Sequence, residues 1–295
     1  MLRPLRAGFV TIVGRPNVGK STLLNRLVGQ KVAIVTEKPQ TTRNRILAIA
    51  NTASAQIVFF DTPGIHKPKH EMNRRMVDLA LQSVKNVDLA LLIVDVTEPF
   101  GGGDEFVLER VRQAKVPVVL VLNKVDRIRK PEILTIIDDY RRRHEFTDIV
   151  PISALTGENV DALISVLERQ LPEGEPLYPP ETLTDLPERF FVSEIVREKI
   201  LEATREEIPY STAVVIDSWE EGEKLTRIEA SILVERESQK GIVVGKGGSM
   251  LKGIGTAARQ DIEAFLGAKV FLGLHVKVRS EWRENQRLLS ELGIE

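Results

Sequence analysis

The stretch Gly14-Arg15-Pro16-Asn17-Val18-Gly19-Lys20-Ser21 decides the fold of the N-terminal half of this chain. It fits the spacing G-x-x-x-x-G-K-S/T, and it lies between a short apolar run and a segment with helical periodicity. Glycine permits a loop whose backbone N–H groups converge on phosphate oxygens, and the start of a helix adds partial positive charge. We therefore predict a P-loop that continues into Thr22, in which Lys20 contacts the β- and γ-phosphates and Ser21 ligates Mg²⁺.

The sequence around this loop predicts an α/β fold. Short apolar runs alternate with helical segments, which is typical of a mostly parallel sheet, here of six strands, with helices on both faces. The runs are Phe9–Val13, Arg45–Ala50, Gln56–Asp61, Leu89–Asp95, Val116–Leu122 and Ile149–Ile152. A short polar turn joins the second run to the third, so we expect those two strands to be antiparallel.

Base selectivity is predicted from Asn123-Lys124-Val125-Asp126, which ends the strand 116–122. A carboxylate at Asp126 accepts hydrogen bonds from guanine N1–H and the exocyclic amine, whereas adenine offers no matching pair of donors. The carboxyl ends of parallel strands form the ligand edge of such sheets. Ser153, Ala154 and Leu155 end the next strand at the same edge. We therefore expect GTP and GDP as ligands.

Metal binding is predicted from two further motifs. Asp61-Thr62-Pro63-Gly64 ends a strand and offers a carboxylate for the outer shell of Mg²⁺, while Gly64 can approach the γ-phosphate closely. The segment Pro39-Gln40-Thr41-Thr42-Arg43 carries two hydroxyls, of which one can ligate the metal, and we favour Thr42. The predicted metal set is Ser21, Thr42 and Asp61.

The chain divides into two predicted domains. The stretch from Leu171 to Pro187 holds five of the fifteen prolines together with several acidic residues, which is typical of an extended linker. We predict a GTPase domain over 1–171, a linker over 172–188 and a second domain over 189–295.

A G-x-x-G motif marks the second domain. Gly245-Lys246-Gly247-Gly248 separates two helical segments within 238–266, and we expect Ser249 to cap the second of them. Strand-like runs at 212–218 and 224–234 precede this unit, and a strand at 269–278 and a helix at 281–292 follow it. This order predicts an α+β KH domain of the prokaryotic type, type II, which clamps about four nucleotides of single-stranded nucleic acid.

The predicted RNA surface surrounds that loop. Between Arg236 and Arg287 there are ten Lys or Arg against five Asp or Glu, although the whole chain has a net charge of -1. The predicted contact residues are Lys240, Ile242, Val243, Val244, Gly245, Lys246, Gly247, Gly248, Ser249 and Lys252. A solvated helix face remains the alternative for the basic residues, and core packing remains the alternative for the three aliphatic ones.

Composition excludes several classes of protein. The chain has no cysteine, which excludes disulfide scaffolds and thiol nucleophiles and fits a reducing compartment. The four histidines, at 66, 70, 144 and 275, lack zinc-ligand spacing. No apolar stretch reaches the roughly 20 residues that span a bilayer, and the N-terminus does not resemble an export signal. Cytoplasm is the expected location.

Taken together, the motifs GRPNVGKS, QTTR, DTPG, NKVD and SAL resemble those of the translation-factor-related branch of small GTPases. With the KH-like half, the chain resembles the Era family of bacterial GTPases within the TrmE-Era-EngA-like group. The resemblance implies GTP hydrolysis, binding of 16S rRNA near its 3′ end during 30S subunit assembly, and release on hydrolysis. It also implies a monomer without DNA as a partner, and reports for the family add peripheral association with the inner face of the cell membrane.

One position departs from many GTPases, which place a water-orienting glutamine after D-x-x-G. Ile65 stands there and cannot polarise water, so we expect slow intrinsic hydrolysis that depends on Asn17, Lys20, Thr42 and Gly64. In related GTPases an asparagine at the position of Asn17 helps to hold K⁺, and the resemblance implies the same here. A purely conformational role of Asn17 is the alternative. For the whole chain, the alternative function is a GTPase-timed KH protein that acts on mRNA or tRNA.

Overall fold

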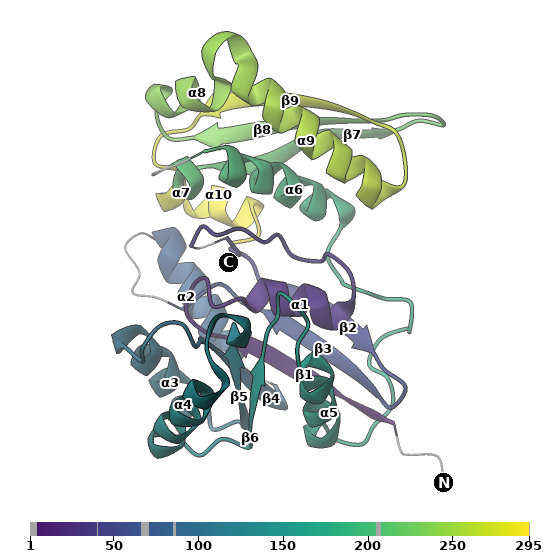
Figure 1. Cartoon of the computed structure of the whole chain (residues 1–295). Coiled ribbons are helices and arrows are strands. Elements are labelled where there is room, and N and C mark those ends of the chain that lie inside the picture. The colour runs from purple at the N-terminus through teal and green to yellow at the C-terminus, as the bar shows by residue number, and fades with distance from the viewer. Residues whose placement is uncertain (1–4, 40, 66–70, 85–86, 205–207, 295) are drawn as a thin grey trace. The chain divides into compact units, whose positions relative to one another are not determined.

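The computed structural model describes residues 5–39, 41–65, 71–84, 87–204 and 208–294. They form two compact units (Figure 1). The first consists of Met1–Ala33, Thr42–Lys69 and Asn73–Asp185, and the second of Ile34–Thr41, His70–Met72 and Leu186–Glu295. The segment Ile34–Thr41 therefore belongs to the C-terminal unit, although its sequence lies in the N-terminal half.

The first unit contains a six-stranded sheet with the order β2-β3-β1-β4-β5-β6. Its strands are β1 (Arg6–Val13), β2 (Ile46–Asn51), β3 (Ala55–Asp61), β4 (Leu89–Asp95), β5 (Val118–Asn123) and β6 (Asp148–Ile152). Neighbouring strands are parallel except β2 and β3, which are antiparallel. The predicted α/β fold is confirmed, including the antiparallel edge strand.

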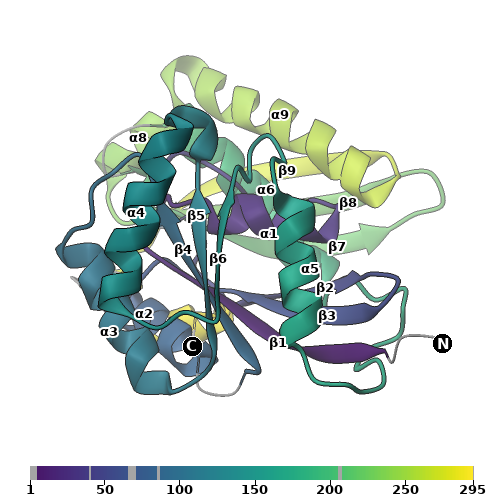
Figure 2. The same cartoon turned by 60° about the horizontal axis from the view of Figure 1, so that its bottom comes forward.

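Helices cover both faces of this sheet (Figure 2). They are α1 (Lys20–Val28), α2 (Glu71–Ser83), α3 (Gly102–Ala114), α4 (Lys130–Arg143) and α5 (Val160–Gln170), with a 3-10 turn η1 (Val125–Arg127) after β5. Because side chains alternate along a strand, Leu92 and Val94 of β4 point into one core cluster, where they meet Val107 and Leu108 of α3. The parallel strands end at one edge, so the residues that follow them are brought together there.

The proline-rich stretch, predicted as an extended linker, makes hydrogen bonds with the first unit as far as Asp185. It runs along the first unit: Ile49 N–H of the edge strand β2 donates to Leu183 O at 2.9 Å, and Ala7 N–H donates to Pro172 O at 3.2 Å. Tyr178 packs against Leu47 and its neighbours. An edge strand has unpaired backbone groups, and this stretch satisfies some of them with its carbonyls, which proline retains.

The second unit contains a three-stranded sheet with the order β7-β8-β9, antiparallel between β7 and β8 and parallel between β8 and β9. The elements are α6 (Glu188–Ala203), α7 (Ile208–Ser211), β7 (Ala213–Glu221), β8 (Thr226–Val234), α8 (Glu237–Val244), η2 (Lys246–Gly248), α9 (Ser249–Leu266) and β9 (Val270–Val278). Apolar residues of α6 and α9, such as Val196 and Ala258, share one core with the sheet. The predicted type II KH fold is confirmed.

The C-terminal segment differs from the single helix predicted over 281–292. It forms a 3-10 turn η3 (Trp282–Glu284) and a short helix α10 (Gln286–Glu291). Asn285 separates them, because its side chain accepts a hydrogen bond from Leu288 N–H at 3.0 Å and so caps α10.

Throughout the described residues, no helix combines the length and the apolar character that crossing a membrane requires.

Candidate functional site

The P-loop residues connect the end of β1 to the start of α1. Gly14 lies where a side chain does not fit, since an added Cβ would lie 2.4 Å from the carbonyl oxygen of Ile93. Gly19 has φ 99° and Asn17 has φ 64°, both in the left-handed region that glycine and asparagine adopt most readily. The backbone of 14–19 therefore has the left-handed turns that let successive N–H groups converge on an anion.

Asn123 joins three of the predicted motifs. Its side-chain Nδ2 donates to Val18 O in the P-loop at 2.7 Å, and its Oδ1 accepts from Ala154 N–H at 2.9 Å. A Cβ at Gly19 would lie 2.3 Å from the same Nδ2, so this contact requires glycine there. Asn123 thus fixes the P-loop, the N-K-x-D segment and the S-A-L segment relative to one another.

Lys124 and Asp126 lie on either side of the start of η1. Lys124 has φ 70° and its ammonium forms an ion pair with Asp95, the last residue of β4. Burial tends to raise the pKa of Asp95, but hydrogen bonds from Lys124 and Thr97 outweigh it and hold the pKa below its ordinary value. Asp126 is exposed, so its carboxylate is accessible to a base that enters at this edge.

The S-A-L segment lies beside α1. Ser153 and Ala154 are buried, whereas the side chain of Leu155 is exposed. Arg26 of α1 donates to Leu155 O at 2.6 Å and to Ala154 O at 3.4 Å. These contacts hold the backbone of 153–155 next to the end of β5, which Ala154 contacts through Asn123.

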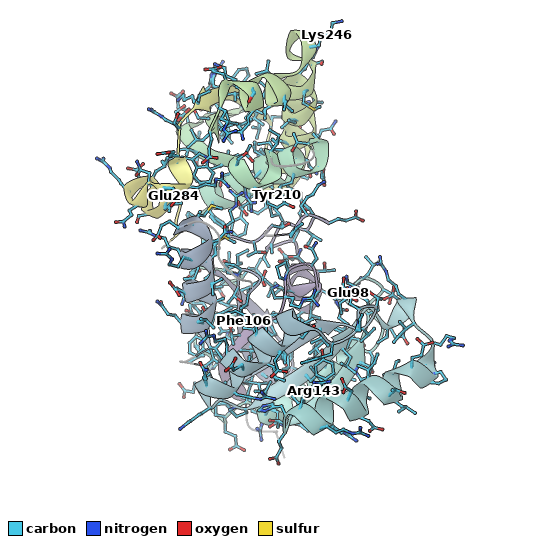
Figure 3. All side chains as sticks on the ribbon, turned by 90° about the vertical axis from the view of Figure 1, so that its left-hand side faces the viewer. Glu98, Phe106, Arg143, Tyr210, Lys246 and Glu284 are labelled. Atoms are coloured by element: carbon cyan, nitrogen blue, oxygen red, sulfur yellow. The ribbon has the colours of Figure 1, made fainter. Side chains whose placement is uncertain are left out.

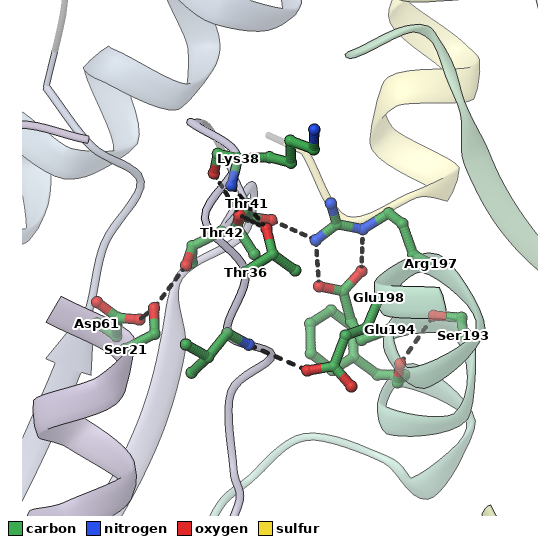
Figure 4. A network of polar contacts seen from close by, with 12 residues as sticks. Ser21, Thr36, Lys38, Thr41, Thr42, Asp61, Ser193, Glu194, Arg197 and Glu198 are labelled. Atoms are coloured by element: carbon green, nitrogen blue, oxygen red, sulfur yellow. Dashed lines mark hydrogen bonds and ion pairs between the residues drawn. The ribbon is translucent and has the colours of Figure 1, made fainter. Parts of the chain in front are cut away.

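Three oxygen-bearing side chains meet at the start of α1. The Ser21 hydroxyl donates to Asp61 Oδ2 at 2.7 Å and lies 2.8 Å from the hydroxyl of Thr42 (Figure 4). Asp61 is fully buried, and its Oδ1 has no hydrogen-bond partner in the described part of the chain. Burial raises the pKa of Asp61 to about 6, although the charge of Lys20 and the Ser21 hydroxyl oppose the shift. Hydroxyl and carboxylate oxygens of this kind suit a hard divalent cation.

The hydroxyl of Thr41 is engaged elsewhere. It donates to Lys38 O at 2.7 Å and lies 2.7 Å from the hydroxyl of Thr36. Of the two adjacent threonines, Thr42 is the one whose hydroxyl meets Ser21. The geometry therefore favours Thr42 over Thr41 as a candidate metal ligand. Gln40 of the same motif lies outside the described residues.

The side chain of Lys20 folds back against the backbone of the P-loop. Its ammonium donates to the carbonyl oxygens of Gly14 at 3.2 Å and Arg15 at 2.8 Å. Burial lowers the pKa of Lys20 to about 8, and the nearby charge of Asp61 opposes the shift. A buried cation that donates to carbonyl oxygens and lies near a carboxylate charge is suited to bind additional anionic oxygens.

The segment after β3 packs directly on the P-loop. Thr62 donates from its hydroxyl to Ile12 O at 2.9 Å, and Pro63 is buried beside it. At Gly64 an added Cβ would lie 2.8 Å from Pro16 N and Cα, so the two loops touch through backbone. Glycine is required at 64 for this close approach.

The G-x-x-G loop lies between α8 and α9 of the second unit. Gly245, Gly247 and Gly248 all have positive φ, of 72°, 60° and 79°. At Gly245 a Cβ would lie 2.6 Å from Met250 Cβ, whereas the positions 247 and 248 open to space. Lys246 points away from the loop at its tip (Figure 3). The loop thus presents an open backbone and one lysine to a ligand.

Side chains beside this loop only partly match the predicted RNA surface. Lys252 is exposed and Lys240 is half-buried. Ile242 is 49% exposed, but Val243 is fully buried in the core of the unit, because a helix that packs on a sheet must turn one face inward. The placement of Val243 on the RNA surface was therefore wrong. Val244 is half-buried.

The predicted cap of α9 also needs correction. Ser249 is the first residue of the helix, and Gly248 occupies the N-cap position without a side-chain hydrogen bond. Gly247 and Gly248, both with positive φ, let the backbone turn sharply into α9, so no hydroxyl cap forms.

Comparison with known proteins identifies the family. A family model described as 50S ribosome-binding GTPase matches residues 9–124, and a KH domain model matches residues 207–283. A crystal structure of an Aquifex aeolicus Era variant bound to GDP·AlF4⁻ is 44% identical, covers 98% of this chain and 99% of its own, and superposes with a TM-score of 0.95. A structure of Era with MgGDPNP and nucleotides 1506–1542 of 16S ribosomal RNA has the same identity and coverage, with a TM-score of 0.96. The chain belongs to the Era family of GTPases.

In this Era-family GTPase the side chain of Ile65 takes no part in the nucleotide site. It is 1% exposed and packs into the core cluster with Val13, Leu92 and Val94. Its backbone N–H donates to Gly14 O at 3.2 Å and so helps to fix the P-loop. The backbone of Ile65 therefore helps to hold the P-loop in place, and its buried apolar side chain does not orient water.

Some neighbours of the site in this Era-family protein were not predicted from the sequence. Arg15 forms ion pairs with Glu98 and Asp104, each at 3.0 Å, so its side chain is directed to the start of α3. Asp95 ends an apolar strand as Asp61 does, and that shared signal could have identified it. Arg26, Glu98 and Asp104 carry no such signal. His66 and His70 lie outside the described residues.

Proposed function

We propose that this Era-family GTPase binds single-stranded 16S rRNA near its 3′ end and acts in assembly of the 30S ribosomal subunit, with GTP hydrolysis ending the interaction. The observation that carries the proposal is the match over 98% of the chain to an Era structure that holds both MgGDPNP and a 16S rRNA segment. The match includes both units, so it supports a combined nucleotide and RNA function. The proposed division into domains keeps the predicted bounds 1–171, 172–188 and 189–295.

The nucleotide is proposed to lie along the carboxyl edge of the first sheet. Backbone N–H groups of 14–19 and the ammonium of Lys20 bind the phosphates. Asp126 accepts from guanine, while Asn123, Lys124 and residues 153–155 fix the walls of the base site. The interlocking hydrogen bonds of Asn123 support this arrangement, since one side chain orders loops that would contact both ends of GTP.

The residues present also fit Mg²⁺. Ser21 and Thr42 supply hydroxyl oxygens, and Asp61 supplies a buried carboxylate with one oxygen that has no partner in the described residues. When bound, the metal ion would neutralise charge on the β- and γ-phosphates. Asp61 would orient the Ser21 hydroxyl toward the metal ion, and Thr42 would bring its own segment against it.

Hydrolysis is proposed to be slow in the isolated protein. Ile65 offers no polar group, so Lys20, the backbone of Gly64 and the P-loop are left to stabilise developing charge. We propose K⁺ as an additional cation beside Asn17. The left-handed backbone and the exposure of Asn17 are compatible with this role, and they equally suit the conformational alternative.

RNA is proposed to bind across the G-x-x-G loop. The open positions at Gly247 and Gly248 let a phosphate backbone come close, and Lys246 adds a charge at the tip. Ile242 and Val244 are placed to contact bases beside the loop, with Lys240, Lys252 and Ser249 around it. The protein is proposed to act as a cytoplasmic monomer, with peripheral association at the inner face of the cell membrane as a second location.

Crosslinking and sequencing of the RNA bound in cells tests this function. The proposal predicts that reads from the wild-type protein gather near the 3′ end of 16S rRNA. Recovery of mRNA or tRNA without ribosomal RNA would instead favour a GTPase-timed KH protein that acts on those RNAs.

A further inference from the structure

Asp95 is the last residue of β4, and it lies level with Asn123, the last residue of the neighbouring parallel strand β5 (Figure 2). Directly after the strands, Val96 N–H donates to Asn123 O at 3.1 Å. The two strand ends are therefore fixed to each other through their backbones. This register brings the side chain of Asp95 to Lys124, the residue that follows Asn123. All of these residues belong to the first unit.

The carboxylate of Asp95 is bound on both of its oxygens. Oδ1 accepts from the backbone N–H of Thr97 at 3.0 Å and from the Thr97 hydroxyl at 2.6 Å. Oδ2 accepts from the ammonium of Lys124. The two bonds from Thr97 close a local turn that holds the carboxylate in place. The lysine therefore meets an acceptor whose direction is already set.

The side chain of Lys124 takes its direction from this carboxylate. The backbone of Lys124 is held in the left-handed region at φ 70°, and its carbonyl accepts from Arg127 N–H at 3.0 Å. Beyond the backbone, a lysine has four rotatable bonds and loses much rotamer freedom when it is fixed. Among the described residues, Asp95 is the hydrogen-bond acceptor of the Lys124 ammonium.

Partial burial makes this ion pair stronger than an ordinary surface pair. The side chains of Lys124 and Asp95 are 25% and 11% exposed. By comparison, the ion pair of Arg169 with Asp148, at the start of β6, spans 3.6 Å between side chains that are 65% and 38% exposed. Water and salt screen exposed pairs and affect sheltered ones less.

We propose that Asp95 is a positioning residue of the guanine site, because it holds Lys124 in place as a wall of that site before the nucleotide binds. Both partners belong to the protein, so the nucleotide does not have to order the lysine itself. An ammonium that is held by Asp95 is also kept from pairing with the exposed carboxylate of Asp126, two residues on. The inference rests on the proposed guanine site and adds a residue outside its motifs.

The test combines Asp95→Asn with Lys124→Met and uses Asp148→Asn as a matched control. Asparagine has the shape of aspartate and keeps an acceptor for Thr97, so the change removes the charge that Lys124 meets. Asp148 likewise accepts from a backbone N–H and pairs with a cation, but it lies at the start of its strand. The affinity for a fluorescent GDP analogue is measured for each variant, and urea unfolding shows whether each is folded.

Asp95→Asn should weaken GDP binding about tenfold, since the nucleotide must then order a free lysine, whereas Asp148→Asn should stay within about twofold of wild type. Lys124→Met should weaken binding at least as much as Asp95→Asn. In the Lys124→Met background, Asp95→Asn should cost no more than about a further twofold, because no ammonium is left to direct. Losses that add in the double variant, or wild-type affinity in Asp95→Asn, would overturn the inference.

A measurement on the wild-type protein covers the case in which Asp95→Asn does not fold. NMR relaxation reports the order of lysine ammonium groups, and the Lys124 signal is the one that disappears in Lys124→Met. The inference predicts an ordered Lys124 ammonium without nucleotide, and an ammonium that becomes ordered only when GDP is added would contradict it. Binding of ADP as tight as that of GDP to the wild type would instead refute the proposed guanine site, on which the inference depends.

Discussion

The side-chain amide of Asn123 and the backbone carbonyl of Val18 are joined by a buried hydrogen bond of 2.7 Å. The two residues are 105 positions apart, and the other end of the same amide accepts from Ala154 N–H. Asn123 is 2% exposed, so neither bond competes with solvent. One side chain thus holds the phosphate-binding and base-binding loops in a fixed relation.

Replacing Asn123 by Ala should therefore reduce both stability and nucleotide affinity. Two buried backbone groups lose their partner, which costs about 2–4 kcal/mol in the free energy of unfolding. Urea unfolding and binding of a fluorescent GDP analogue measure the two effects. Asn51→Ala is the control, since Asn51 also makes two side-chain hydrogen bonds but is exposed. Equal small losses in both variants would contradict the role of Asn123.

The guanine assignment of Asp126 predicts a change of base preference. In Asp126→Asn the amide can donate to the carbonyl that xanthine carries in place of the guanine amine, so xanthine nucleotides should bind in preference to GDP. Because Asp126 is exposed, the substitution should leave the unfolding transition unchanged. Competition between GDP, XDP and ADP for the labelled nucleotide measures the preference. Unaltered selectivity for GDP would refute the assignment.

The buried carboxylate of Asp61 predicts a specific loss of metal dependence. Asp61→Asn keeps the side-chain shape but removes the negative charge beside Ser21, so Mg²⁺ should no longer tighten nucleotide binding. GDP affinity is measured in Mg²⁺ and in EDTA. Asp88→Asn, at the opposite end of the strands where Asp88 accepts from Phe9 N–H, is the control and should respond to Mg²⁺ as the wild type does. A Mg²⁺ response that survives in Asp61→Asn would argue against the proposed metal site.

The proposed K⁺ site predicts a difference between two monovalent salts. GTP turnover should be faster in K⁺ than in Na⁺ at equal ionic strength, because the ion adds positive charge near the phosphates. Asn17→Gly retains the left-handed backbone at this position but removes the side chain, so it should abolish the difference while keeping nucleotide affinity. Identical wild-type turnover in the two salts would favour the purely conformational role of Asn17.

Local patterns were enough to predict the fold of both units and the positions of the nucleotide motifs. Gly14, Asp61 and Asn123 each follow or end an apolar strand, and parallel strands carry such residues to one edge. The hydrogen bond from Arg197 to Thr41 O could not be predicted in this way. Arg197 lies 156 residues away in sequence, and nothing in the pattern around it distinguishes a buried arginine from a surface one.

Two other differences have the same physical origin. Val243 was placed on the RNA surface because it belongs to an apolar run beside the G-x-x-G loop, but a run of three cannot show which helix face turns inward. The stretch 172–188 was predicted from its composition as an extended linker, without contacts to the sheet. Its carbonyls nonetheless pair with edge N–H groups such as that of Ile49, which sequence alone does not show to be unpaired.

The central claim is that GTP hydrolysis and RNA binding reside in separate units, with the G-x-x-G loop as the RNA clamp. Gly247→Asp and Gly267→Asp test it as a matched pair, since both replace a glycine of positive φ (60° and 63°) that faces open space with a charged residue. Binding of a single-stranded RNA from the 3′ end of 16S rRNA and basal GTP hydrolysis are measured for each. The account predicts that Gly247→Asp loses RNA binding and keeps GTP hydrolysis, whereas Gly267→Asp keeps both. Retained RNA binding in Gly247→Asp, or equal loss of both activities, would contradict it.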